Sequence, residues 1–227
     1  MTDKSRKLLI AAAALTALFV LLTVLLKVVD VQAVGPQQSK IGFATLNAAF
    51  ATTIGYNSTF YYIATVLGIF CLLIAACFAL MGVAQLVATK DIRRVNYRIL
   101  AVGGLYVLVV LCYIFFELVV INYRPVAIND KLAPSYPSSH TLLALTITIS
   151  AAMILKGVLK KRRLAELLGW VCVGLGVLTV LCRLLSGVHW LTDIIGGMLL
   201  SAALLTWFAF ALQLIRDRRR MREWEEQ

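Results

Sequence analysis

Residues 58–89 read STFYYIATVLGIFCLLIAACFALMGVAQLVAT and contain no charged side chain. A helix needs about 20 apolar residues to cross a bilayer. This stretch is long enough to cross with a tilt, or to extend past the bilayer surface. It therefore predicts a membrane-spanning helix, and the rest of the chain repeats the pattern.

Five more apolar stretches flank it, at residues 8–29, 99–121, 139–158, 165–185 and 192–215. The chain of 227 residues is 61% hydrophobic, with a mean hydropathy of +0.89. Soluble domains are usually about 45–50% apolar. We expect an all-α fold, an integral membrane bundle of about six transmembrane helices that forms a single domain over residues 1–227.

The basic residues are unevenly distributed. Of the 22 lysines and arginines, all but five lie at the N-terminus, at residues 90–98, at residues 156–163 and at residues 216–222. These four segments fall on one side of a six-span bundle. Because basic loops stay in the cytoplasm, we expect both termini to be cytoplasmic. The formal net charge of +11 is thus concentrated in loops, and the sequence predicts no nucleic-acid partner.

The connection at about residues 30–57 would then lie outside. Phe43, Leu46, Phe50 and Ile54 recur at helical spacing, which predicts a short helix lying in the membrane interface. Its role is either to pack against the bundle or to form a lip over a lipid entrance.

Polar residues gather where the later spans meet the outer side. They are Arg124, Ser138, Ser139, His140, Arg183, His189 and Asp193. Ionisable residues at membrane depth are costly and usually mark a functional site. Both histidines of the chain belong to this group.

The residue types in this layer suit phosphoryl chemistry. Asp193 lies four residues after His189, so on a helix it could orient the imidazole and leave one nitrogen as a nucleophile. The alternative is an aspartate that only stabilises a helix start. Arg124 and Arg183 come from different spans and could bind a phosphoryl group from two sides. The alternative is that these arginines only extend toward the membrane surface, or pair with Asp130 or Glu117.

Three motifs follow one another in the family that these residues resemble, the type 2 phosphatidic acid phosphatase superfamily, which is related to vanadium haloperoxidases. Its second motif, Pro-Ser-Gly-His, corresponds to PSSH at residues 137–140. Its third, Ser-Arg, five residues, His, three residues, Asp, is matched from Cys182 to Asp193. Its first, Lys, six residues, Arg-Pro, keeps Arg124-Pro125 but has Glu117 in place of the lysine.

The resemblance implies a metal-independent hydrolase without a cofactor. His189 would be the nucleophile, Asp193 its orienting partner and His140 the acid that protonates the leaving group. Arg124, Arg183, Ser138 and Ser139 would hold the phosphoryl oxygens.

We therefore expect a phosphatase of membrane lipid phosphates or diphosphates in a bacterial plasma membrane, with its site on the extracytoplasmic side. Undecaprenyl diphosphate, phosphatidylglycerol phosphate and phosphatidic acid are candidate substrates. A lipid phosphotransferase, or a non-hydrolytic lipid binder or transporter, remains the alternative. The sequence does not define an oligomeric state.

Glu117 is the main departure from the family pattern. On a continuous helix it would share a face with Arg124, seven residues later. We expect its carboxylate to pair with Arg124 or Arg183 as a supporting residue. Lys131 is a candidate for part of the missing positive charge, although a solvated loop lysine is the simpler interpretation.

The charge distribution predicts the topology. On a cysteine-free background, a cysteine at position 131 should react with an impermeant reagent added from outside, and one at position 162 should not, because basic loops stay inside. Labelling at position 162 but not at position 131 would contradict this orientation.

Overall fold

The computed structural model describes residues 1–128 and 132–225. Within them the chain forms seven α-helices and two short 3-10 helices. The α-helices are α1 (Asp3–Val28), α2 (Ala44–Ile54), α3 (Ser58–Thr89), α4 (Tyr97–Leu118), α5 (Ser139–Val158), α6 (Arg162–Leu185) and α7 (Leu191–Glu225). The 3-10 helices are η1 (Pro36–Gln38) and η2 (Ile92–Arg94).

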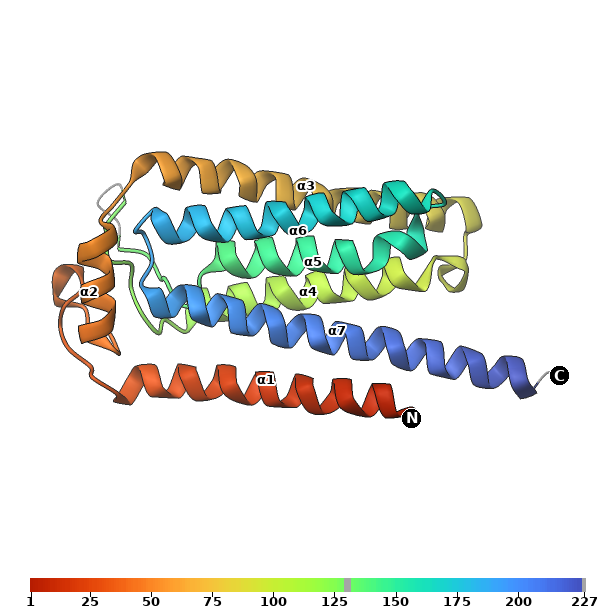
Figure 1. Ribbon diagram of the computed structural model, residues 1–227, viewed down its shortest axis with the longest axis horizontal. Coiled ribbons are helices and arrows are strands. Elements are labelled where there is room, and N and C mark those ends of the chain that lie inside the picture. Colours follow the sequence, from red (N-terminus) through yellow and green to blue (C-terminus); the bar gives the residue numbers. More distant parts are fainter. Residues whose placement is uncertain (129–131, 226–227) are drawn as a thin grey trace.

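The six long helices lie side by side, and α2 crosses one end of the bundle (Figure 1). The start of α1 and the end of α7 lie toward the opposite end. Within the described residues, six helices are long and apolar enough to cross a membrane, as the sequence predicts. The prediction ends the last span near residue 215, but α7 continues to Glu225 because its polar end is rich in arginine and glutamate, which are good helix formers.

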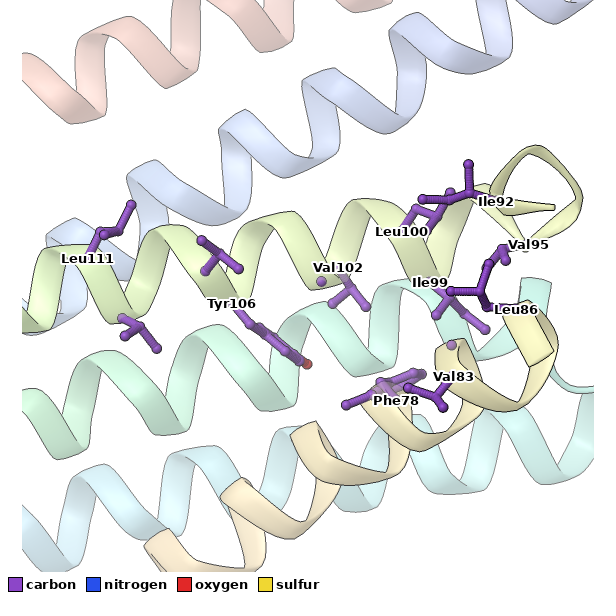
Figure 2. Close-up of a pocket in the computed structure, with 15 residues that line it drawn as sticks. Phe78, Val83, Leu86, Ile92, Val95, Ile99, Leu100, Val102, Tyr106 and Leu111 are labelled. Carbon is purple, nitrogen blue, oxygen red and sulfur yellow. The ribbon is translucent and has the colours of Figure 1, made fainter. Parts of the chain in front are cut away.

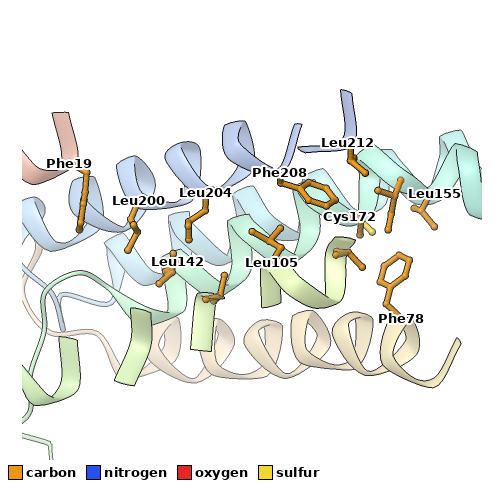
Figure 3. Packing of buried hydrophobic residues seen from close by; sticks show 14 of the residues in the cluster. Phe19, Phe78, Leu105, Leu142, Leu155, Cys172, Leu200, Leu204, Phe208 and Leu212 are labelled. Carbon is orange, nitrogen blue, oxygen red and sulfur yellow. The ribbon is translucent and has the colours of Figure 1, made fainter. Parts of the chain in front are cut away.

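Buried apolar side chains from all six long helices form one cluster along the bundle (Figure 3). Phe19 of α1 and Leu204 of α7 lie in it with Leu105 of α4. Lipid tails are as apolar as leucine, so close van der Waals packing rather than escape from water favours helix association here.

Small residues bring α6 close to α5. The buried face of α6 contains Ala165, Gly169, Cys172, Gly176 and Thr179, at helical spacing. A methyl group on Gly176 would collide with the side chain of Thr148 on α5. Such stripes let two backbones approach closely inside a membrane.

The segment expected to form a short helix contains α2, and polar contacts fix α2 to the start of α7. The Asn47 side chain is fully buried, and its Nδ2 donates to Oγ1 of Thr192 at 2.9 Å. The backbone N–H of Thr192 donates to Oδ1 of Asn47 at 3.2 Å. Since the first N–H groups of a helix have no partner within the helix, Asn47 satisfies one of them in α7.

Candidate active site

His189 and Asp193 form the centre of the polar layer. His189 lies in the loop just before α7, and Asp193 lies in the first turn of that helix. Nδ1 of His189 is 3.6 Å from Oδ2 of Asp193, and both side chains are almost completely buried. This separation is slightly longer than a hydrogen bond, as is common for catalytic pairs without substrate. The two side chains therefore lie close together, as their spacing predicts, but no hydrogen bond joins them, and only Asp193 is helical.

Two donors hold the Asp193 carboxylate. The backbone N–H of Trp190 donates to Oδ2 at 3.0 Å, and Nδ2 of Asn122 donates to Oδ1 at 3.3 Å. Asn122 is itself buried. Sequence reasoning missed it, since a lone asparagine near the end of an apolar span carries no recognisable pattern.

The segment before α5 packs directly on α7. The backbone N–H of Ser138 donates to the carbonyl of Asp193 at 3.0 Å. A Cβ on Gly197 would lie only 3.0 Å from the carbonyl oxygen of Ser138, so glycine permits this approach. Oγ of Ser138 is the N-cap of α5, where it accepts from the Thr141 N–H at 3.5 Å. His140 thus lies in the first turn of α5, as expected.

Arg183 reaches the site because it continues the buried stripe of α6, four residues after Thr179. Its guanidinium carbon lies 5.2 Å from the ring centroid of Tyr61 on α3, a cation–π contact. Tyr61 is a second residue that the sequence did not reveal, because the contact joins two helices far apart in the chain.

Arg124 lies on an extended segment that pairs with residues 133–135. The N–H of Arg124 donates to the carbonyl of Ala133 at 3.1 Å, and the N–H of Ser135 donates to the carbonyl of Asn122 at 2.9 Å. The indole N–H of Trp190 donates to the carbonyl of Tyr123 at 2.6 Å. These bonds connect the segment around Arg124 to the loop before α5 and to the loop before α7.

Unbonded polar atoms concentrate in this layer. Among the residues described, ten buried side-chain nitrogen and oxygen atoms have no hydrogen-bond partner, and eight of them belong to the polar layer. They come from Asn122, Arg124, Ser135, His140, Arg183 and His189. Buried polar groups are normally hydrogen-bonded, so such a concentration indicates a ligand site.

Burial, followed by the positive charges of Arg183 and Arg124, holds the pKa of His189 well below its ordinary value. The imidazole is therefore neutral at physiological pH, with a lone pair available on one ring nitrogen. The two arginines supply the charge that an anionic ligand would need.

The expected pairing of Glu117 is not present. No ion pair between described residues includes Glu117, and its side chain is exposed near the end of α4. The reason is that α4 ends at Leu118 and the chain continues in extended form, so Arg124 is not on the same helix. Glu117 instead borders a small hollow with Ser135 and Ser139. Lys131 lies outside the described residues.

A large hollow lies away from this cluster. An apolar groove of about 550 Å³ opens between α3 and α4, and its lining includes Phe78, Val102 and Leu111 (Figure 2). The one hydroxyl in its lining, on Tyr106, is 3.2 Å from Oγ of Ser150. The groove therefore lacks groups for acid–base or phosphoryl chemistry.

A smaller hollow of about 240 Å³ lies at the same end of the bundle as α2. It lies between α2 and the two loops that carry Arg124 and His189, with Thr52, Pro125 and Trp190 in its lining.

Comparisons with known proteins agree with this arrangement. The chain resembles a solved structure described as the first transmembrane PAP2 type phosphatidylglycerolphosphate phosphatase from Bacillus subtilis. The TM-score is 0.57 and the sequence identity 16%, over 91% of this chain and 96% of that one. No curated protein gave a significant match. A family profile, PAP2 superfamily, matches residues 101–217, from α4 to the far part of α7. Since this match covers more than half of the sequence, the chain belongs to the PAP2 superfamily.

Proposed function

We propose that the protein is a membrane lipid phosphatase that works through a phosphohistidine intermediate. The observation that carries this proposal is the set of eight unbonded, buried polar atoms around two arginines and two histidines. Phosphate offers the negative charge and the acceptor oxygens that these groups need.

His189 attacks phosphorus with the nitrogen that faces away from Asp193. As the new P–N bond forms, the bond from phosphorus to the leaving oxygen breaks. His140 carries a proton when the anionic substrate is bound beside it, and it donates this proton to the leaving oxygen and becomes neutral. Arg124 and Arg183 stabilise the charge on the equatorial oxygens. His140 then takes a proton from water, which attacks the phosphohistidine and releases phosphate.

The substrate class follows from the surroundings of the site. The site lies at the end of a membrane-spanning bundle, where a phosphate headgroup can reach it while the tails stay in lipid. Undecaprenyl diphosphate, phosphatidylglycerol phosphate and phosphatidic acid fit this description. The distribution of basic residues supports a site on the extracytoplasmic face of a bacterial plasma membrane.

Phosphate release from these three lipids in detergent tests the proposal. Release from at least one of them is expected. Transfer of phosphate to an added lipid in place of water would identify a phosphotransferase. Stoichiometric lipid binding without release or transfer would identify a non-hydrolytic binder and contradict the proposal.

The mechanism predicts different effects for the two histidines. His189→Ala should abolish turnover, because no nucleophile remains. His140→Ala should slow lipid hydrolysis by about 10²–10⁴-fold, the usual contribution of a general acid. With a good leaving group it should still accumulate a phosphoenzyme, which rapid quenching of labelled substrate would detect.

The control for this prediction is a chelator. Activity should persist in EDTA, since a histidine nitrogen rather than a metal-bound water attacks. Activity that EDTA removes and magnesium restores would contradict the mechanism.

Asn122 should act as a positioning residue for Asp193. Asn122→Ala removes the donor to Oδ1 and should lower kcat about 10-fold or more, with KM nearly unchanged, as for other residues that orient a catalytic group. The matched control is Asn57→Ala, which removes a helix cap of α3 in the same layer. An equal effect of both variants on kcat would show that Asn122 acts only through stability.

Glu117→Lys should not reduce activity. The carboxylate holds no arginine among the described residues, so a lysine there displaces none. It replaces negative charge with positive charge near Ser139, and a modest fall in KM is expected. Glu117→Gln should lie between the two in a steady-state assay. A tenfold loss of kcat in the lysine variant would restore the supporting role predicted from the sequence.

A further inference from the structure

A second polar hollow lies at the opposite end of the bundle from His189, where α4 begins and α7 nears its end. Its volume is about 470 Å³. Four of the six residues that line it are arginines. The lining residues are Tyr97, Arg98, Gln213, Arg216, Arg219 and Arg220.

Two of these arginines are held in place by one aromatic ring. The guanidinium carbons of Arg98 and Arg219 lie 4.6 and 4.4 Å from the ring centroid of Tyr97. Each contact is a cation–π interaction. Tyr97 thus holds two like charges near one another, and an anion beside them would offset their repulsion.

The backbone near the end of α5 leaves room for the side chain of Arg98. A Cβ on Gly157, near the end of α5, would collide with its guanidinium group. The Gly157 carbonyl accepts from Nη1 of Arg98 at 3.4 Å and from Nδ2 of Asn96 at 3.2 Å. The Arg98 side chain therefore lies against the backbone at Gly157 and does not extend freely into solvent.

Among the described residues, no carboxylate forms an ion pair with any of these four arginines. The ion pairs that the described part of the chain forms include none of the four arginines. Asp217 is adjacent in sequence, but its Oδ2 accepts from Oγ1 of Thr2 on α1 at 2.8 Å, and its Oδ1 accepts from Nε2 of Gln213 at 2.9 Å.

We propose that this hollow, the arginine pocket, binds the phosphate group of an anionic phospholipid. Guanidinium groups match phosphate oxygens in geometry and charge. The pocket lies where the apolar part of α7 gives way to a run of arginines, and basic pockets between membrane-spanning helices bind anionic headgroups. The proposal is independent of the phosphatase activity, because no residue of the arginine pocket belongs to the catalytic cluster.

Native mass spectrometry of the full chain in detergent, titrated with phosphatidylglycerol, tests this site. The double variant Arg98→Gln with Arg219→Gln should bind this lipid about 25-fold more weakly, at about fivefold for each charge near the headgroups. The matched control, Arg162→Gln with Arg163→Gln, removes two exposed arginines from the start of α6 and should bind as the unmodified chain does. Equal loss in both variants, or equal binding of phosphatidylcholine, would overturn the proposal.

Two further measurements separate a built site from simple attraction. Arg98→Lys with Arg219→Lys keeps the charge but loses the planar donors, so binding should remain clearly weaker than in the unmodified chain. Full binding by this variant would refute the pocket. Inorganic phosphate should compete only weakly, and competition at the same concentration as the lipid would overturn the lipid assignment. Thermal unfolding without added lipid should match among all variants and confirm that they are folded.

Discussion

Arg183 is buried with two of its guanidinium nitrogens unbonded, and a charge in that position is costly unless the surrounding structure compensates for it. On insertion scales an arginine at the centre of a membrane helix costs about 2.5–3.5 kcal/mol. Here the residue lies near the end of α6, against the ring of Tyr61. The free-energy cost of burying the Arg183 charge therefore arises at a position where a bound anion would offset it.

The stripe of small residues on α6 determines where that charge lies. Because Gly176 lets α6 approach α5 closely, the same face carries Arg183 toward the start of α5, where His140 lies. Substituting a larger residue in the stripe would separate the two helices and move the arginine away from the histidine. Packing in the apolar part of the bundle thus controls the geometry of its polar end.

The other residues of the site lie in loops, and hydrogen bonds fix the positions of these loops. Asn122 and Ser135 pair through the main chain, and Trp190 binds the same segment through its indole N–H. The Asn47 side chain holds the first turn of α7 from the outer helix. The loops that carry Arg124 and His189 are therefore held by contacts to each other and to the segment before α5, and the start of α7 is held by α2.

The sequence by itself determined the six long apolar helices, a short helix between the first two of them, and a set of polar residues at one end of the bundle. The length of an apolar stretch, the helical spacing of its residues and the spacing from Arg183 to Asp193 are all local properties of the sequence. The tertiary structure alone decided that Asn122 holds Asp193, that Tyr61 lies against Arg183 and that four arginines surround a hollow at the far end. It also decided against a Glu117–Arg124 pair, because α4 ends between the two residues. These features depend on contacts between segments distant in sequence, or on the residue at which a helix ends. Local residue patterns do not predict either of them.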